Sequence, residues 1–326
     1  MTTLDMSSFR ITPVSGAIGT KDATGAAPIA NPLGPLALLP GTWKGRGFNQ
    51  IWRPFFGGPP TQDRFLELNE TAEVLQFVEI PGDIPNRGLL QADITLHGVT
   101  YLQKINDAHV LNSGKPAGIH IEPGIWVSVP NTTSPNDPAT VARMANIPHG
   151  TSLVAQGKAI TVPTGPTISP VDITPFRIGN PAAKIPFPES NLSIPSAFRT
   201  RPDDIPHVTQ AMVDNPNSVL TAAIAGKNIK STTVLIINTT VSVAPSTPVP
   251  TSGGGTSNIA FLAGDGGGPN ANAAQMQAIF WIEEIHRVHH DDPRFFLQYT
   301  QTVLLNFNGL SWPHVSAATL VKQHED

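Results

Sequence analysis

The sequence predicts an all-β fold, an antiparallel β-barrel with long proline-rich loops and one short helix. Many segments alternate apolar and polar residues with a period of two and are rich in β-branched and aromatic residues, as strands are. No regular alternation with helices separates them, which favours antiparallel pairing. The 326 residues include 28 glycines and 33 prolines, a content typical of a folded protein with many loops. Residues 33–326 are expected to form one barrel domain.

The first strands of the predicted barrel follow a small, polar N-terminal arm, residues 1–32. Residues 41–54 form a glycine-rich aromatic strand, whose glycines permit tight curvature or close backbone approach. In residues 89–105 the apolar positions change parity after Gly98, which predicts a β-bulge or tight hairpin at His97 and Gly98. Further strands are predicted within residues 117–130, 150–162, 231–243, 275–288, 295–307 and 312–321.

Proline-rich segments and one helix interrupt the strands. Residues 163–206 are dense in proline, which favours extended backbone wrapped over a surface. Residues 207–227 have helical spacing, but Pro216 divides them, so we expect the helix after Asn217. Residues 244–258 combine proline, serine and glycine and are predicted to be a flexible connection.

Composition and charge limit the partners of the protein. The formal net charge of −4 and the pI near 6.2 provide no basic surface for phosphate contacts, so we expect no nucleic acid partner. The absence of cysteine excludes disulfides and thiolate chemistry. No secretory signal and no apolar run long enough for a membrane helix is visible, so we expect a cytoplasmic protein without a membrane partner. A small-molecule ligand is expected, and a homodimer is left open.

Three motifs occur in a characteristic order. They are GTWKGRG (41–47), HIEPGIWVSVP (120–130) and WPHVSAATL (312–320). This set resembles the nitrobindin-like haem-binding β-barrels, which are related to the lipocalin and fatty-acid-binding barrels. The positions that match the family pattern are Gly41, Thr42, Trp43, Gly45, Gly47, His120, Glu122, Gly124, Trp126 and His314.

The resemblance implies a lipocalin-like barrel that binds haem b, with His314 as the proximal iron ligand. It also implies action on nitric oxide or peroxynitrite, or weak peroxidase activity. The cofactor-binding residues that it suggests are His314, Trp43, Thr42, His120, Trp126 and Trp312. About half of the chain is covered, because family barrels are shorter and residues about 130–275 are expected to be inserted. Ile125 and Val127 depart from the family pattern and leave the detailed pocket chemistry open.

The residues around His314 are compatible with this reading. Alternation on the terminal strand places Trp312, His314, Ser316 and Ala318 on one face, where an imidazole and small neighbours suit a flat macrocycle. The alternative is that His314 is an ordinary hydrogen-bonded strand residue. His120 and Glu122 also share a strand face, with a structural hydrogen-bond network as the favoured role, and His149 precedes a strand, where it caps the pocket or faces solvent.

The densest ionisable cluster lies in residues 283–294. Glu284 and His286 share a strand face and form the best acid-base pair if the protein is an enzyme, a point that the sequence leaves open. With His289, His290, Asp291 and Asp292, they also have the side-chain types of a metal site, although a polar hairpin loop is the favoured reading.

Two alternative functions therefore accompany haem binding. One is a haem-free carrier of an apolar molecule, lined by Trp43, Trp126, Phe280 and Trp312. The other is a metal-dependent enzyme that uses the His and Glu residues of 284–290. A phosphate-binding loop and a nucleophile elbow are both excluded, since neither motif is present.

Overall fold

The computed structural model describes residues 31–59, 62–134, 136–240, 254–264, 267–286 and 294–323. Contacts divide the chain into Met1–Asn31 and one compact unit, Pro32–Asp326. The predicted arm therefore lies outside the described residues, except for its last two positions. The same holds for most of the predicted connection 244–258.

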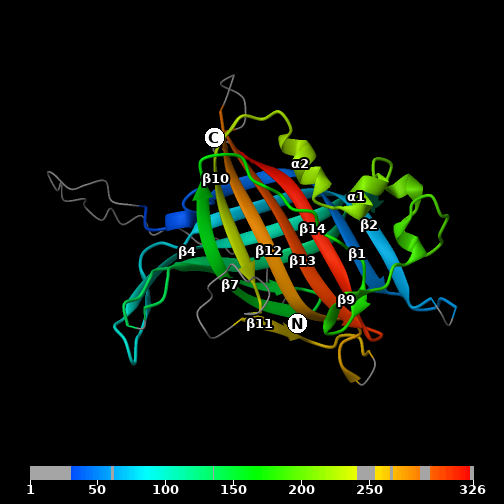
Figure 1. Cartoon of the computed structure of the whole chain (residues 1–326), viewed down its shortest axis with the longest axis horizontal. Coiled ribbons are helices and arrows are strands. Elements are labelled where there is room, and N and C mark those ends of the chain that lie inside the picture. The colour runs from blue at the N-terminus through cyan, green and yellow to red at the C-terminus, as the bar shows by residue number, and fades with distance from the viewer. Residues whose placement is uncertain are drawn as a thin grey trace. The chain divides into compact units, whose positions relative to one another are not determined.

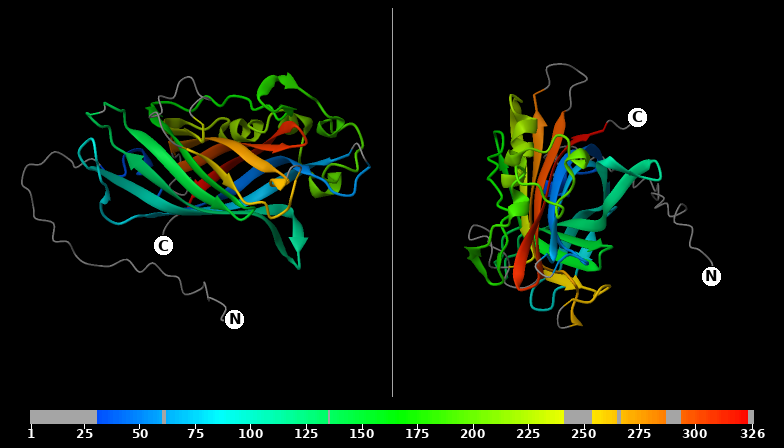
Figure 2. Two further views of the ribbon diagram at one scale, coloured as in Figure 1. Left: turned by 90° about the horizontal axis from the view of Figure 1, so that it is seen from below. Right: turned by 90° about the vertical axis from the view of Figure 1, so that its right-hand side faces the viewer.

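Ten antiparallel strands close into a barrel, which confirms the predicted fold class (Figures 1 and 2). Each strand pairs with its neighbours in the order β1, β2, β4, β5, β6, β7, β10, β12, β13, β14, and pairing of β14 with β1 closes the ring. These strands are β1 (Gly41–Pro54), β2 (Arg64–Glu79), β4 (Ile94–Asn112), β5 (Lys115–Val129), β6 (Thr140–Ile147), β7 (Thr151–Val162), β10 (Ile229–Asn238), β12 (Asn272–Ile285), β13 (Phe295–Phe307) and β14 (Leu310–Lys322).

Shorter elements decorate the barrel. β3 pairs with β4, β11 pairs with β7, and the β8–β9 hairpin pairs with the start of β14. Their bounds, with those of the helices, are β3 (Ile84–Asn86), β8 (Phe176–Arg177), β9 (Asn180–Lys184), β11 (Gly255–Asn258), η2 (Gly34–Leu36), η3 (Pro188–Ser190), η4 (Pro202–Asp204), α1 (Gln210–Asp214) and α2 (Ser218–Ile224). Among the described residues, none of the helices has the length and apolar character needed to cross a membrane.

Gly45 and Gly47 of β1 lie where β1 pairs with β14 to close the barrel, and they show the close backbone approach that the sequence predicted. A Cβ atom on Gly45 would lie 2.0 Å from the carbonyl oxygen of Thr319, and one on Gly47 would lie 2.5 Å from that of Ala317. Side chains at these positions would push β1 and β14 apart. The glycines are therefore required for close backbone approach.

Neither the β-bulge nor the tight hairpin predicted at His97 and Gly98 is formed. β4 runs straight through these residues, and its register with β5 is unbroken from His97 to Ile105. The parity change instead marks a change of partner, because residues before Gly98 pair with β3 and those after it pair with β2. A Cβ atom on Gly98 would lie 2.4 Å from the carbonyl oxygen of Trp126, so this glycine too allows close approach.

The predicted insertion, residues about 130–275, is only partly outside the barrel. It contains the barrel strands β6, β7 and β10, since these alternate and pair like the others. The rest includes residues 163–228, here called the strap segment. The strap segment contains the predicted helix as α2, which begins after Asn217, and a second helix, α1, before Pro216.

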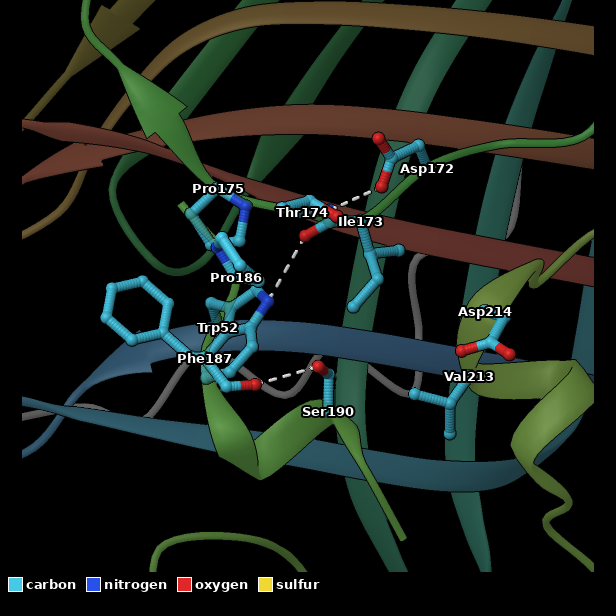
Figure 3. Close-up of a pocket in the computed structure, with 10 residues that line it drawn as sticks. All are labelled: Trp52, Asp172, Ile173, Thr174, Pro175, Pro186, Phe187, Ser190, Val213 and Asp214. Carbon is cyan, nitrogen blue, oxygen red and sulfur yellow. Dashed lines mark hydrogen bonds between the residues drawn. The ribbon is translucent and has the colours of Figure 1, made fainter. Parts of the chain in front are cut away.

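An outer apolar cluster, which includes Trp52, Val213 and Trp312, fixes the strap segment to the barrel wall, where α2 lies close to β14 (Figure 1). The indole nitrogen of Trp52 donates to the carbonyl oxygen of Ile173 at 3.2 Å, and Figure 3 shows this bond. Phe187 from the strap segment stacks on Trp312 with ring centroids 5.2 Å apart. Such buried aromatic contacts stabilise beyond their burial by about 0.5–1.5 kcal/mol per pair.

Side chains of the inward face fill one part of the barrel interior. This core cluster contains Trp43, Trp126 and Phe280, all at most 3% exposed. Phe280 packs edge-on against Trp126 and stacks on Tyr299. Beside this cluster, the interior contains buried polar side chains and a cavity.

Candidate functional site

A cavity of about 350 Å³ lies inside the barrel. Its lining is mixed, as is common in sites that bind small organic molecules. The polar and charged lining residues are Asn49, Arg53, Glu67, Gln103, His120, His149, Thr151, Thr256, Asn270, Tyr299, Gln301, His314 and Ser316. The others are Ile51, Pro54, Ile105, Ile119, Ile147, Leu153, Ala271, Ala273, Met276, Val303 and Leu305.

His314 lies in the wall of this cavity, on the inward face of β14 with Ser316. Withdrawal of the ring from bulk water lowers its pKa to about 3, and the nearby His120 and His149 act in the same direction. Burial has this effect because it disfavours the charged imidazolium. The ring is therefore neutral at physiological pH and carries one nitrogen lone pair.

A hydrogen-bond relay fixes the tautomer of His314. The Asp107 carboxylate can only accept, and it receives the amide Nδ2 of Asn69 at 2.9 Å. Asn69 Oδ1 then accepts from Asn49 Nδ2 at 3.1 Å, which leaves Asn49 Oδ1 as an acceptor. That oxygen lies 2.7 Å from His314 Nε2 and accepts from Ser316 Oγ at 2.9 Å. The proton of the His314 ring is thus on Nε2 and the lone pair on Nδ1.

Two further histidines line the cavity. The rings of His120 and His149 have centroids 6.2 Å apart, and His120 Nε2 lies 3.2 Å from Glu122 Oε2. Burial lowers the pKa of His149, and the charge on His120 adds to this. The shared strand face of His120 and Glu122, predicted from alternation, therefore leads to a direct contact.

The buried ion pair of Glu122 and Arg143 contacts His120 through the Glu122 carboxylate. Arg143 contacts the Glu122 carboxylate, and its Nε donates to the Tyr101 hydroxyl at 2.7 Å. Burial alone would raise the pKa of Glu122, but the positive charge of Arg143 and the hydrogen bonds lower it to about 2. Arg143 Nη1 also donates to Gln301, a cavity residue, at 2.7 Å. The ion pair is thus tied to the cavity wall.

A second buried carboxylate, that of Glu73, contacts the cavity residues Tyr299 and Gln103. Glu73 accepts from the Tyr299 hydroxyl at 2.7 Å and from Thr71 Oγ1 at 2.7 Å. Gln103 donates to the Tyr299 oxygen at 2.9 Å. Burial raises the pKa of Glu73 despite these bonds. The network holds the polar groups of Tyr299 and Gln103 in fixed orientations at the cavity.

The structure separates the other residues suggested by the resemblance from the cavity. Trp43 and Trp126 belong to the core cluster, and the Trp43 indole donates to Leu39 O at 2.8 Å. Thr42 alternates to the opposite face of β1 from Trp43. Trp312 belongs to the outer apolar cluster, because its ring stacks on Phe307 at 4.7 Å where the β13–β14 hairpin turns. Strict alternation had placed it beside His314.

The predicted acid-base pair lies away from the cavity. Glu284 faces the basic groups of Lys230 and Arg294, at 3.2 and 3.4 Å. These contacts offset the effect of burial and lower the pKa of Glu284. His286 is exposed, and neither residue lines the cavity. His289, His290, Asp291 and Asp292 lie outside the described residues.

A smaller pocket of about 110 Å³ lies between β1 and the strap segment (Figure 3). Its lining combines two aromatic residues and two prolines with Ile173 and Val213, and its polar lining residues are Asp172, Thr174, Ser190 and Asp214. Ser190 Oγ donates a hydrogen bond to Phe187 O at 2.8 Å, which joins two residues within the strap segment. The pocket is smaller than the cavity in the barrel, and no histidine is among its lining residues.

Comparisons with known proteins give little information. No protein-family model matches the chain, and no curated protein matches its sequence. A solved structure titled "Crystal Structure of Rv2717c from M. tuberculosis" aligns with 89% of this chain and 98% of its own, at 15% identity and a TM-score of 0.38. Similarity at this level assigns neither family nor function.

Proposed function

We propose that the cavity binds haem, with His314 as the axial ligand of the iron. One observation carries this proposal: a neutral imidazole with a fixed tautomer lies on a rigid strand in the wall of a half-apolar cavity. A metal-ligating histidine commonly donates its other ring N–H to an oxygen, which fixes its orientation. The Asn49 oxygen has that role here, and Nδ1 of His314 would be the ligand atom.

The other residues that line the cavity suit the parts of haem that surround the iron. Ile105, Leu153 and Leu305 offer apolar contact for a macrocycle. His120 and His149 supply two more imidazoles within the same cavity. Bound haem would supply an iron that takes up a diatomic gas or peroxide, while the pocket residues control access and hydrogen bonding.

Binding of nitric oxide or peroxynitrite is favoured over strong peroxidase activity. Peroxidase chemistry benefits from a free, positioned acid-base pair beside the bound oxygen. The guanidinium groups near the cavity are committed elsewhere, because Arg143 pairs with Glu122 and Arg53 pairs with Glu67. A scavenging or isomerising role therefore fits the charges better.

A second candidate is haem-free transport of a small apolar molecule. The observation in its favour is that His314 Nε2 already has a partner in Asn49, so the ring satisfies the ordinary structural role as well. Exposed Ile259 and Phe261 lie next to the turn at Gly150, which follows the cavity residue His149. These side chains would favour entry of an apolar ligand.

Titration with haemin tests both candidates. We expect a Soret band in the wild type, its loss in His314→Gly and its partial recovery when imidazole is added to that variant. His286→Ala, at an exposed position outside the cavity, should bind haemin normally. Failure of the wild type to take up haemin, or an unchanged spectrum in His314→Gly, would overturn haem ligation. Uptake of an apolar fluorescent probe by a haem-free protein would then support the carrier.

A further inference from the structure

Glu70, His109 and His207 come together on the outer face of the barrel, away from the cavity. One ligand atom from each lies within 4.8 Å of the other two. Glu70 is on β2, His109 is on β4, and His207 belongs to the strap segment. Along β2 the inward positions are odd-numbered, as Glu67 and Glu73 show, so Glu70 faces outward. These three residues are far apart in the sequence and come together only in the folded chain. We call them the strap cluster.

We propose that the strap cluster binds a divalent transition-metal ion, with Zn²⁺ as the best fit. Two imidazoles and one carboxylate are typical zinc ligands, and a water molecule completes a tetrahedral site. Hard ions such as Ca²⁺ and Mg²⁺ prefer six or more oxygen ligands, which the cluster lacks. In a tetrahedral site with bonds of about 2.0–2.1 Å, ligand atoms lie about 3.4 Å apart, so only small side-chain movements are required.

In the absence of an ion, the contacts among Glu70, His109 and His207 leave atoms of these side chains available as metal ligands. His109 Nε2 lies 2.7 Å from one oxygen of Glu70, and His207 Nδ1 lies 3.2 Å from the other. The buried Nε2 atom of His109 nevertheless makes no hydrogen bond of acceptable geometry to any described residue. Two imidazoles thus converge on one carboxylate, an arrangement that an ion between them would satisfy.

Two of the ligands are held in place and the third can adjust. The backbone N–H groups of His109 and Val110 both donate to Asp107 Oδ1 at 2.8 Å, which fixes the chain that carries His109. Glu70 lies within a paired strand. The His207 side chain is 73% exposed and can rotate onto an ion. An ion would therefore fasten the strap segment to β2 and β4.

Calorimetric titration of the full chain with ZnCl₂ tests the site. The starting protein carries His286→Ala, His289→Ala and His290→Ala, so that the other histidine-rich segment cannot contribute. We expect one equivalent of Zn²⁺ to bind and to protect the strap segment from limited proteolysis. His207→Ala and Glu70→Gln should each weaken binding by at least about tenfold. Mg²⁺ should neither bind nor protect.

The control is His97→Ala. His97 also approaches a carboxylate, Asp83, at 3.8 Å, but no third ligand accompanies this pair among the described residues. Its replacement should leave Zn²⁺ affinity unchanged. The proposal is overturned if the starting protein binds no Zn²⁺, or if affinity and proteolysis are the same with and without His207. Because His207 is exposed, its loss should not prevent folding.

Discussion

Replacement of Glu283 by glutamine should make the protein more stable at alkaline pH. Glu283 lies on the outer face of β12, is 0% exposed, and neither carboxylate oxygen has a hydrogen-bond partner among the described residues. Burial raises its pKa from 4.5 to about 8. The folded protein thus keeps this carboxyl protonated at neutral pH, whereas the unfolded chain ionises it.

The sign and size of the effect follow from linkage. A raised pKa in the folded state gives stability that is full below about pH 4.5 and is lost as the pH rises towards 8. At about 1.36 kcal/mol per pKa unit, the loss between pH 5 and pH 8 is about 3 kcal/mol. Glutamine does not titrate, so Glu283→Gln should lack this loss.

Denaturant unfolding at pH 5 and pH 8 measures the difference. The quantity of interest is the change in variant-minus-wild-type stability between the two pH values, which cancels any constant cost of the amide. Glu79→Gln, at an exposed position of β2, controls for the removal of one carboxylate. The reasoning is refuted if Glu283→Gln and the wild type differ by the same free energy at both pH values.

Three further results are expected. In ¹⁵N NMR spectra the His314 ring should stay neutral, with its proton on Nε2, from pH 8 down to about pH 4, since its pKa is about 3; titration near pH 6.5 would contradict this. Arg143→Met should lower the free energy of unfolding by about 3–5 kcal/mol, because it leaves the buried Glu122 charge unpaired, and Glu122→Gln in the same chain should restore part of the loss. Trp312→Ala should cost about 3–5 kcal/mol in thermal or denaturant unfolding while the folded variant keeps haemin affinity, and weaker affinity would place Trp312 in the binding site.

The barrel was predictable because its signal is local. Alternation with period two follows directly from strand geometry, and eight of the ten barrel strands were predicted from the sequence, whereas β2 and β6 were not. Gly45 and Gly47 likewise indicated the close approach that the seam requires. Parity alone, however, could not distinguish a bulge from a change of partner at Gly98, since both alter which face meets the neighbouring strand.

The candidate site was predictable only in part. The family resemblance singled out His314 and His120, alternation placed each on a strand face, and both line the cavity. Trp312 was misplaced, because aromatic stacking at the hairpin end outweighs regular alternation there. Asn49 and Asn69 gave no signal, because isolated amides in a strand are common.

The strap cluster was missed for a different reason. Its three ligands lie far apart in the sequence, and no two of them have the short spacing that marks a metal motif. Strand pairing and the path of the strap segment decide their proximity. Such a site becomes visible only when the register of β2 and the course of residues 163–228 are known together.

Strand register also explains why polar residues in the barrel act as a unit. Asn49 faces Asn69 directly across β1 and β2, and Thr71 faces Asp107 across β2 and β4. A shift of one residue in either pairing would turn these groups to the other face and break the relay to His314. The pairing of β2 with β4 also brings Glu70 near His109, which lies two residues beyond Asp107 on β4. The proposed haem ligand and the proposed metal site therefore share the β2–β4 pairing, although each can be tested without the other.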